Sequence, residues 1–209
     1  MRGAQANARP SSDDRRAAML AIARAAFLRE GYSAASVSEI AAKVGGSKAT
    51  LYSYFPSKRD LFAAVIEEEV RLMLAPLFEM SETQGDVRTV LERFARRFLD
   101  MLLSEDTVAF YRLIVAESAR FPEIGQAAYH IGVQHGLDRL ADYFLAAMER
   151  GELRRTEASV AVAQFMDLCA GELHRKRLFG VVGADDRSEV EKQAKNAVTT
   201  FLAAYGAMK

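Results

Sequence analysis

The sequence predicts an all-α protein of about nine helices, in which a small N-terminal unit of three helices precedes a larger helical bundle. Each periodic segment places its apolar residues at the 3.6-residue repeat of a helix, and no run shows the strict alternation of a half-buried strand. Serines suited to helix starts and glycines suited to helix ends stand at the borders of these segments. Half of the 209 residues are hydrophobic, which is ample for a core.

The first expected helix spans residues 15–30, where apolar side chains recur on one face. Gly31 follows at the position where a residue in the left-handed conformation ends a helix. Next, Ser36 and Glu39 have the S-x-x-E spacing of a capping box, in which two side chains satisfy free amides at a helix start. They predict a short second helix, which Gly45 ends.

A third short helix begins after Ser47 and stops at Phe55, because a residue that precedes proline avoids the helical conformation. Ser57 and Asp60 repeat the serine–acid spacing and open a long helix. We expect residues 122–150 to form one helix, which three glycines weaken in its first half. From the long helix onward the expected ranges are 58–79, 86–103, 107–120, 122–150, 157–179 and 188–205.

Charge divides the chain unevenly, although its formal net charge is zero. Residues 1–60 carry ten Lys and Arg against five Asp and Glu, and the remainder is acidic. A basic N-terminal quarter on an acidic body indicates that this quarter meets a polyanion. We expect a disordered tail over residues 1–14, because this segment is small and polar, a three-helix domain over 15–60 and the bundle over 61–209.

Composition argues against several classes of protein. A single cysteine rules out a disulfide framework, and the start of the chain lacks the pattern of a secretory signal. Apolar runs such as LMLAPLF are too short to cross a bilayer, so we expect a soluble, cytoplasmic protein with no membrane partner. The sequence also lacks GxSxG, P-loop, HExxH and GxGxxG motifs. No enzymatic activity and no cofactor are expected.

The stretch SKATLYSY, residues 47–54, crowds hydroxyls, an ammonium group and two phenols into one short helix. Two short helices joined by a turn at Gly45–Gly46, with a longer helix before them, predict a helix-turn-helix. In that motif the second short helix enters the major groove of DNA. Hydroxyls and a lysine can bind phosphates or base edges there, and Ala49 is small enough to approach a thymine methyl group.

The run SVSEIAAKVGGSKATLYSYFPSKRDLFAAVI resembles the DNA-binding region of TetR-family transcriptional regulators, and the resemblance covers about residues 15–70. The sequence departs from the family at Gly46, where a small apolar residue is more common. Residue by residue, the resemblance implies DNA contacts at Ser36, Ser47, Lys48, Ala49, Thr50, Tyr52, Tyr54 and Lys58.

Further along, FYRLIVAESARFPEIGQAAY and RGELR resemble the C-terminal domain of the AefR-like TetR subgroup, which is often associated with efflux or stress genes. The resemblance implies a repressor that binds a palindromic operator as a homodimer and is released by a hydrophobic small molecule. Residues 15–60 would then be the DNA-binding domain, and 61–209 the effector-binding and dimerisation domain. The long helix that starts at Lys58 belongs to both and is the expected lever between them.

The last two helices mix small residues with large apolar ones, which lets helices approach closely and still bury anchors. TetR-like proteins pair these two helices with their twofold mates, so the expected dimer interface comprises Leu168, Leu173, Ala194, Val198, Phe201 and Leu202. Aromatic and methionine side chains are also frequent in the middle helices, where an adaptable apolar pocket is one alternative to an ordinary core. Its candidate lining is Met73, Phe98, Met101, Phe110, Phe121, His130 and Met166, with His130, His135 or Asp167 as a polar anchor.

Two further readings stay open. Cys169 lies on an apolar stripe, where it is either a small buried hydrophobe or a redox-responsive thiol without a partner cysteine. Alternatively, the protein is an effector-independent dimeric repressor. A metal is not expected, because His130 and His135 lie on different faces of a helix and His174 belongs to another helix.

Overall fold

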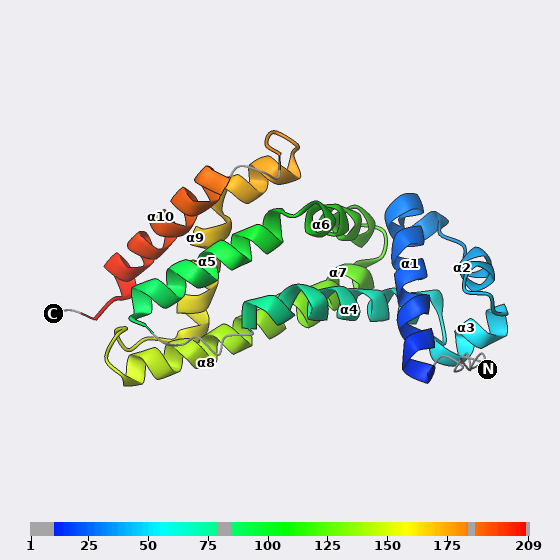
Figure 1. Ribbon diagram of the computed structural model, residues 1–209, viewed down its shortest axis with the longest axis horizontal. Coiled ribbons are helices and arrows are strands. Elements are labelled where there is room, and N and C mark those ends of the chain that lie inside the picture. The colour runs from blue at the N-terminus through cyan, green and yellow to red at the C-terminus, as the bar shows by residue number, and fades with distance from the viewer. Residues whose placement is uncertain (1–10, 79–84, 184–186, 208–209) are drawn as a thin grey trace, which may run out of the picture. The chain divides into compact units, whose positions relative to one another are not determined.

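The computed structural model describes residues 11–78, 85–183 and 187–207. These ranges form ten α-helices and one π-helical segment, with a single isolated bridge between Leu153 and Gly206 (Figure 1). The predicted all-α fold class is confirmed. The helices are α1 (Ser12–Ala34), α2 (Val37–Lys43), α3 (Lys48–Tyr54), α4 (Lys58–Phe78), α5 (Val87–Leu103), α6 (Glu105–Ser118), α7 (Pro122–Ala128), α8 (His135–Glu149), α9 (Ala158–Leu178) and α10 (Arg187–Tyr205).

The chain forms two compact units, residues 1–68 and 69–209. The predicted boundary at residue 60 is earlier, because the first turns of α4 bury Leu61, Phe62 and Val65 in the first unit's core. Phe62 stands edge-on to Phe27 of α1, with 4.8 Å between ring centroids. α4 is one continuous helix that begins in the first unit and ends in the second.

The start of α1 corrects the predicted tail, which was too long. Ser11 is the N-cap of α1, and its side chain accepts a hydrogen bond from the Asp14 amide at 3.0 Å. The Asp14 carboxylate accepts in turn from the Ser11 amide, which completes a capping box. These bonds lower the pKa of the Asp14 carboxyl. Residues 11–14 are therefore ordered, and residues 1–10 lie outside the described ranges.

The turn between α2 and α3 uses glycine where the backbone requires it. Gly45 has a φ of +76°, in the left-handed region, as expected for the residue that ends α2. A side chain at Gly46 would meet only Thr50, at an ordinary 3.7 Å. The fold therefore has room for the small apolar residue that the family more often has at this position.

In the second unit, α10 packs along α5 and α9, and α8 packs on α9 (Figure 1). Phe201 lies in the middle of this core, 5.0 Å from the Phe165 ring and 5.2 Å from the Phe144 ring. Ala194, Val198 and Phe201 have no exposed surface. Their assignment to a dimer interface is corrected, because the chain's own α5, α8 and α9 use this face of α10.

The segment predicted as one helix over 122–150 is three. α7 and α8 are separated by a π-helical segment, Tyr129–Gln134, that contains Gly132. A π-turn carries one extra residue per turn, and such segments interrupt α-helices locally. Of the three glycines that weakened this prediction, Gly132 lies in the interruption, whereas Gly125 belongs to α7 and Gly136 to α8.

α9 is broken at Gly171, whose φ of +47° and ψ of −146° lie outside the helical region. The Gln193 side chain of α10 donates from Nε2 to the Leu168 carbonyl at 2.7 Å and to the Cys169 carbonyl at 3.3 Å. An ideal Cβ on Gly171 would lie 2.5 Å from that nitrogen. The backbone conformation therefore favours glycine here, and any larger residue would also displace the end of the Gln193 side chain.

Cys169 is fully buried in the core of the second unit, and burial raises the pKa of its thiol to about 12. Since the thiolate is the reactive form, this geometry argues against the redox-responsive reading. At pH 8, iodoacetamide should leave Cys169 unmodified in the native protein and alkylate it fully in concentrated urea, as followed by intact mass. Rapid alkylation of the native protein would restore the redox reading.

Candidate nucleic-acid interface

α3 is held to the first unit by one face and presents the other to solvent. Leu51 of α3 and Ile40 of α2 are each 1% exposed and anchor the two short helices in the core. Lys48, Ala49 and Thr50 are exposed. A short helix fixed in this way can present its first turn to a groove without rearranging the core.

The hydroxyls at the start of α3 are organised by the helix cap. The Ser47 side chain accepts from the Thr50 amide at 3.1 Å, and the two side-chain oxygens lie 3.0 Å apart. Either hydroxyl can be the donor in that contact. The pair therefore offers a fixed donor and acceptor at the solvent-facing end of the helix.

The lysine and the two tyrosines of α3 lie along the same short helix. The Lys48 ammonium lies over the ring of Tyr52, 5.6 Å from its centroid. The Tyr54 hydroxyl is 3.5 Å from the hydroxyl of Ser12, the first residue of α1. The start of α1 therefore borders the candidate interface. This border was not predicted, although Ser11 and Asp14 have the same serine–acid spacing that located other helix starts.

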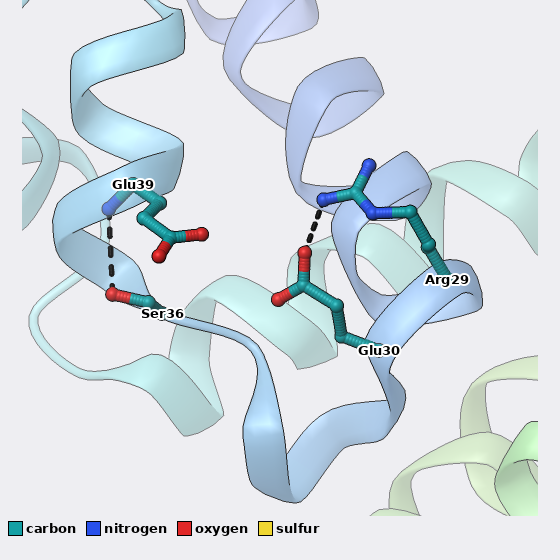
Figure 2. A network of polar contacts seen from close by, with 4 residues as sticks. All are labelled: Arg29, Glu30, Ser36 and Glu39. Carbon is teal, nitrogen blue, oxygen red and sulfur yellow. Dashed lines mark hydrogen bonds and ion pairs between the residues drawn. The ribbon is translucent and has the colours of Figure 1, made fainter.

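Ser36 caps α2, as predicted, but forms only half of the expected capping box. Its hydroxyl accepts from the Glu39 amide at 3.4 Å, and this is the one bond of the box that Figure 2 marks between the two residues. In the same view Arg29 and Glu30, at the end of α1, form an ion pair. The phosphate contact that the resemblance implies at Ser36 stays a prediction.

Lys58 differs most from its expected role. Its ammonium donates to the Ser33 carbonyl at 2.9 Å and lies 5.0 Å from the Tyr32 ring centroid. Lys58 thus fastens the start of α4 to the end of α1. A structural role of this kind is compatible with a phosphate contact, because an ammonium has three donors.

Replacing Lys58 by alanine should lower the free energy of unfolding by about 1–2 kcal/mol, since it removes a charged hydrogen bond and a cation–π contact. If Lys58 also contacts a phosphate, the log–log salt slope of DNA affinity falls by about one. Urea unfolding and salt titrations of binding measure the two effects. Arg59→Ala, at an exposed neighbour, is the stability control. A Lys58→Ala protein as stable as the control would contradict the structural role.

The residues predicted to line an effector pocket are only partly enclosed. Phe98 and Phe110 are buried, and Met73, Met101, Phe121 and Met166 are half-buried. His130 is exposed and stands against the Tyr129 ring, so its assignment to an enclosed pocket is corrected. Asp167 is exposed as well, and the His135 side chain lies outside the described residues.

Two negative findings apply to the described residues. They bring no three His, Cys, Asp or Glu side chains together as a metal site would need. No helix among them combines the length and apolarity that crossing a membrane requires.

Family comparisons agree with this geometry. The model of AefR-like transcriptional repressors, C-terminal domain, matches residues 89–207, and that of bacterial regulatory proteins of the tetR family matches residues 19–65. The chain belongs to the TetR family. It is a TetR-family DNA-binding transcriptional regulator. The first match covers the second unit's α5 to α10, and the second covers the helix-turn-helix.

Solved TetR-family structures cover nearly the whole chain. The flavonoid-responsive regulator FrrA is 31% identical over 95% of this chain and 100% of its own, with a TM-score of 0.84. A TetR-family regulator from Mesorhizobium loti is 28% identical over the same shares, with a TM-score of 0.82. Among curated relatives, the transcriptional activator FasR of Mycolicibacterium smegmatis is 35% identical over 49% of this chain. The chain spans about half of FasR, 46% of its length.

Proposed function

We propose that this TetR-family regulator is a repressor that binds a palindromic operator as a homodimer and is released by a hydrophobic aromatic molecule. The observation that carries the proposal is α3, whose buried Leu51 fixes a row of exposed polar residues. The match of residues 89–207 to AefR-like repressors supports repression. The name of FrrA, which covers 95% of this chain, supports a flavonoid-like effector.

The DNA contacts proposed are those implied by the resemblance, with Thr50 as a base reader and Lys48 as a backbone or guanine contact. A hydroxyl can form a hydrogen bond with a donor or an acceptor on a base edge, whereas an ammonium binds phosphate or guanine. Thr50→Val would keep the helix start, because the Ser47 cap bonds the backbone amide of residue 50. Loss of the hydroxyl alone should therefore relax base preference and leave non-specific affinity intact.

Release requires the effector to favour the form that does not bind DNA. A 99:1 reversal of a two-state equilibrium needs about 5.5 kcal/mol of differential binding. Burial of an aromatic molecule can supply several kcal/mol at about 25 cal/mol per Å² of apolar surface. α4 is continuous from Lys58 to Phe78 and joins the two units covalently, which suits it to carry such a change.

The deciding experiment is selection of bound DNA from a random library, followed by titration with flavonoids. We expect the selection to enrich a DNA sequence with twofold symmetry, and its affinity for the protein to fall steeply with salt. An effective flavonoid should release this DNA and raise the melting temperature of the protein. A reporter driven by the selected site should increase when the regulator is deleted. A reporter that falls instead would identify an activator, as FasR is named. Selection that enriches no sequence would overturn the proposal.

The proposed dimer uses the outward faces of α9 and α10 rather than the buried stripe of α10. Val160 and Ala163 are exposed on α9, and Thr200 and Ala203 are exposed on α10. The predicted interface residues Leu168, Leu173 and Leu202 are half-buried and pack against the core of the second unit. The exposed side chains on the outward faces, such as Ala163 and Ala203, are small and uncharged, which permits two helix pairs to approach closely.

Glutamate at Ala203 should convert the dimer to monomer without unfolding it, because the position is exposed in the single chain and the charge would be buried unpaired between two chains. Sedimentation velocity measures the change and circular dichroism checks the fold. Ala116→Glu, the same change at an exposed position on α6, is the charge control. An Ala203→Glu protein that remains dimeric would place the interface elsewhere.

A further inference from the structure

The junction of α6 and α9 holds a polar atom that the described protein leaves without a partner. The Nε2 atom of His174 is buried and forms no hydrogen bond with any described atom. Leaving such a group unsatisfied is unfavourable, so nearly all buried polar atoms in proteins have partners. His174 lies three residues beyond the break at Gly171.

Tyr111 of α6 covers this imidazole. The two rings stand edge to face, with 5.4 Å between centroids and 82° between planes. Tyr111 is 42% exposed, so the residue that contacts the imidazole is itself accessible to solvent. An aromatic ring that took its place would find the same edge-to-face geometry, in which such pairs are stabilised.

Loose packing does not explain why His174 Nε2 has no hydrogen-bond partner, because hydrogen bonds hold α6 to the end of α9. The Arg112 guanidinium donates from Nε to the Leu178 carbonyl at 3.0 Å and from Nη2 to the Arg177 carbonyl at 3.1 Å. Arg177 in turn donates from Nε to the Leu103 carbonyl at the end of α5, at 2.9 Å. These bonds fix the backbones while Tyr111 can change rotamer.

The imidazole is neutral near pH 7. Burial, and then the positive charge of Arg175, lower the pKa of His174. The neighbouring charged groups on α6 and α9 include Arg112, Glu172 and Lys176, and Glu172 is paired with Lys176 at 3.0 Å. In the tautomer that carries its hydrogen on Nδ1, a neutral imidazole offers Nε2 as an acceptor.

We propose that His174 Nε2 is the hydrogen-bonding anchor of the effector site, and that it accepts a bond from the hydroxyl of a phenolic ligand whose ring replaces Tyr111 against the imidazole. This inference rests on the proposed effector function and assigns its polar contact. It also gives the ligand class a chemical criterion: a planar aromatic ring with a hydroxyl donor. A site built to bond a hydroxyl discriminates against the analogue that lacks it, because its own polar atom then stays unpaired.

The test compares flavone with 4′-hydroxyflavone and 7-hydroxyflavone by calorimetry on the full-length protein. Wild type should bind at least one hydroxyflavone ten or more times more tightly than flavone. His174→Phe should keep the affinity for flavone and lose that preference, whereas the control His130→Phe, at an exposed histidine, should retain it. Loss of affinity for all three ligands alike would overturn the proposal.

A measurement on the wild-type protein covers the case in which His174→Phe does not fold. In ¹⁵N-labelled protein, the favoured hydroxyflavone should shift the Nε2 resonance of His174 and leave that of His130 in place. A bound hydroxyflavone with no shift at His174 would overturn this inference and leave the proposed effector class standing. Absence of binding by all three compounds to wild type, with operator binding intact, would overturn both.

Discussion

Replacing Phe201 by alanine should lower the free energy of unfolding by about 3–5 kcal/mol, the usual cost of removing a buried phenylalanine. Phe201 has no exposed surface and packs against three rings, those of Phe144, Phe165 and Tyr205. These rings come from α8, α9 and α10, so the cavity would open where three helices meet. Urea unfolding followed by circular dichroism measures the loss.

The control is Leu202→Ala, on the next residue of the same helix. Leu202 is half-buried, so its truncation should cost clearly less. Phe201→Glu should misfold rather than dissociate, because the charge would enter the chain's own core. A folded, monomeric Phe201→Glu protein of wild-type stability would return this residue to the dimer interface.

Reversing the charge of Lys48 should weaken operator binding by about 2–3 kcal/mol, roughly 30- to 150-fold, because a carboxylate would then face phosphates or guanine. Lys48 is exposed, and its one described contact is with the Tyr52 ring on its own helix. The fold should therefore be unaffected. Fluorescence anisotropy with the selected operator at fixed salt measures the change.

Arg97→Glu is the matched control, since it makes the same charge change at an exposed position on α5 in the second unit. It should leave affinity within about twofold, because Arg97 lies outside the helix-turn-helix and salt screens exposed charges that make no direct contact with DNA. If Lys48→Glu bound the operator as tightly as this control, α3 would not be the reading helix. The two affinities can be compared only if both variants unfold at the same temperature as the wild-type protein.

The N-terminal unit was largely predictable because its signals are local. Ser36, Ser47 and Ser57 each lie next to the helix that they cap, and Gly45 adopts the left-handed conformation expected of it. A cap is a contact between residues three positions apart, so the sequence contains it directly. The same spacing at Ser11 and Asp14 was overlooked inside a segment whose composition suggested a tail.

The inward face of α10 was not predictable in the same way. Periodicity identified a stripe that includes Ala194, Val198 and Phe201, but a stripe does not reveal whether the chain itself or a second copy covers it. Its partners Phe144 and Phe165 lie more than thirty positions away in sequence. Leu168, Leu173 and Leu202 were assigned to the same interface, yet they are half-buried and pack against the core of the second unit.

The unpaired nitrogen of His174 could not be predicted for a related reason. Its neighbours depend on the break at Gly171 and on Arg112, which bonds carbonyls 65 and 66 positions away. A lone histidine in a charged stretch of helix gives no sign of such an environment. In the sequence, His174 stood out only as a possible metal ligand.

The break in α9 has a consequence for how substitutions in this helix are to be read. Because Gly171 departs from helical geometry, the residues before and after it belong to two separate angular registers, and a single helical projection drawn through both would misplace those after it. Gln193 of α10 bonds the carbonyls at the join. The direction of the segment that carries His174 is therefore inherited partly from a side chain on another helix, and exchanges at position 193 can alter α9 without any change in its own sequence.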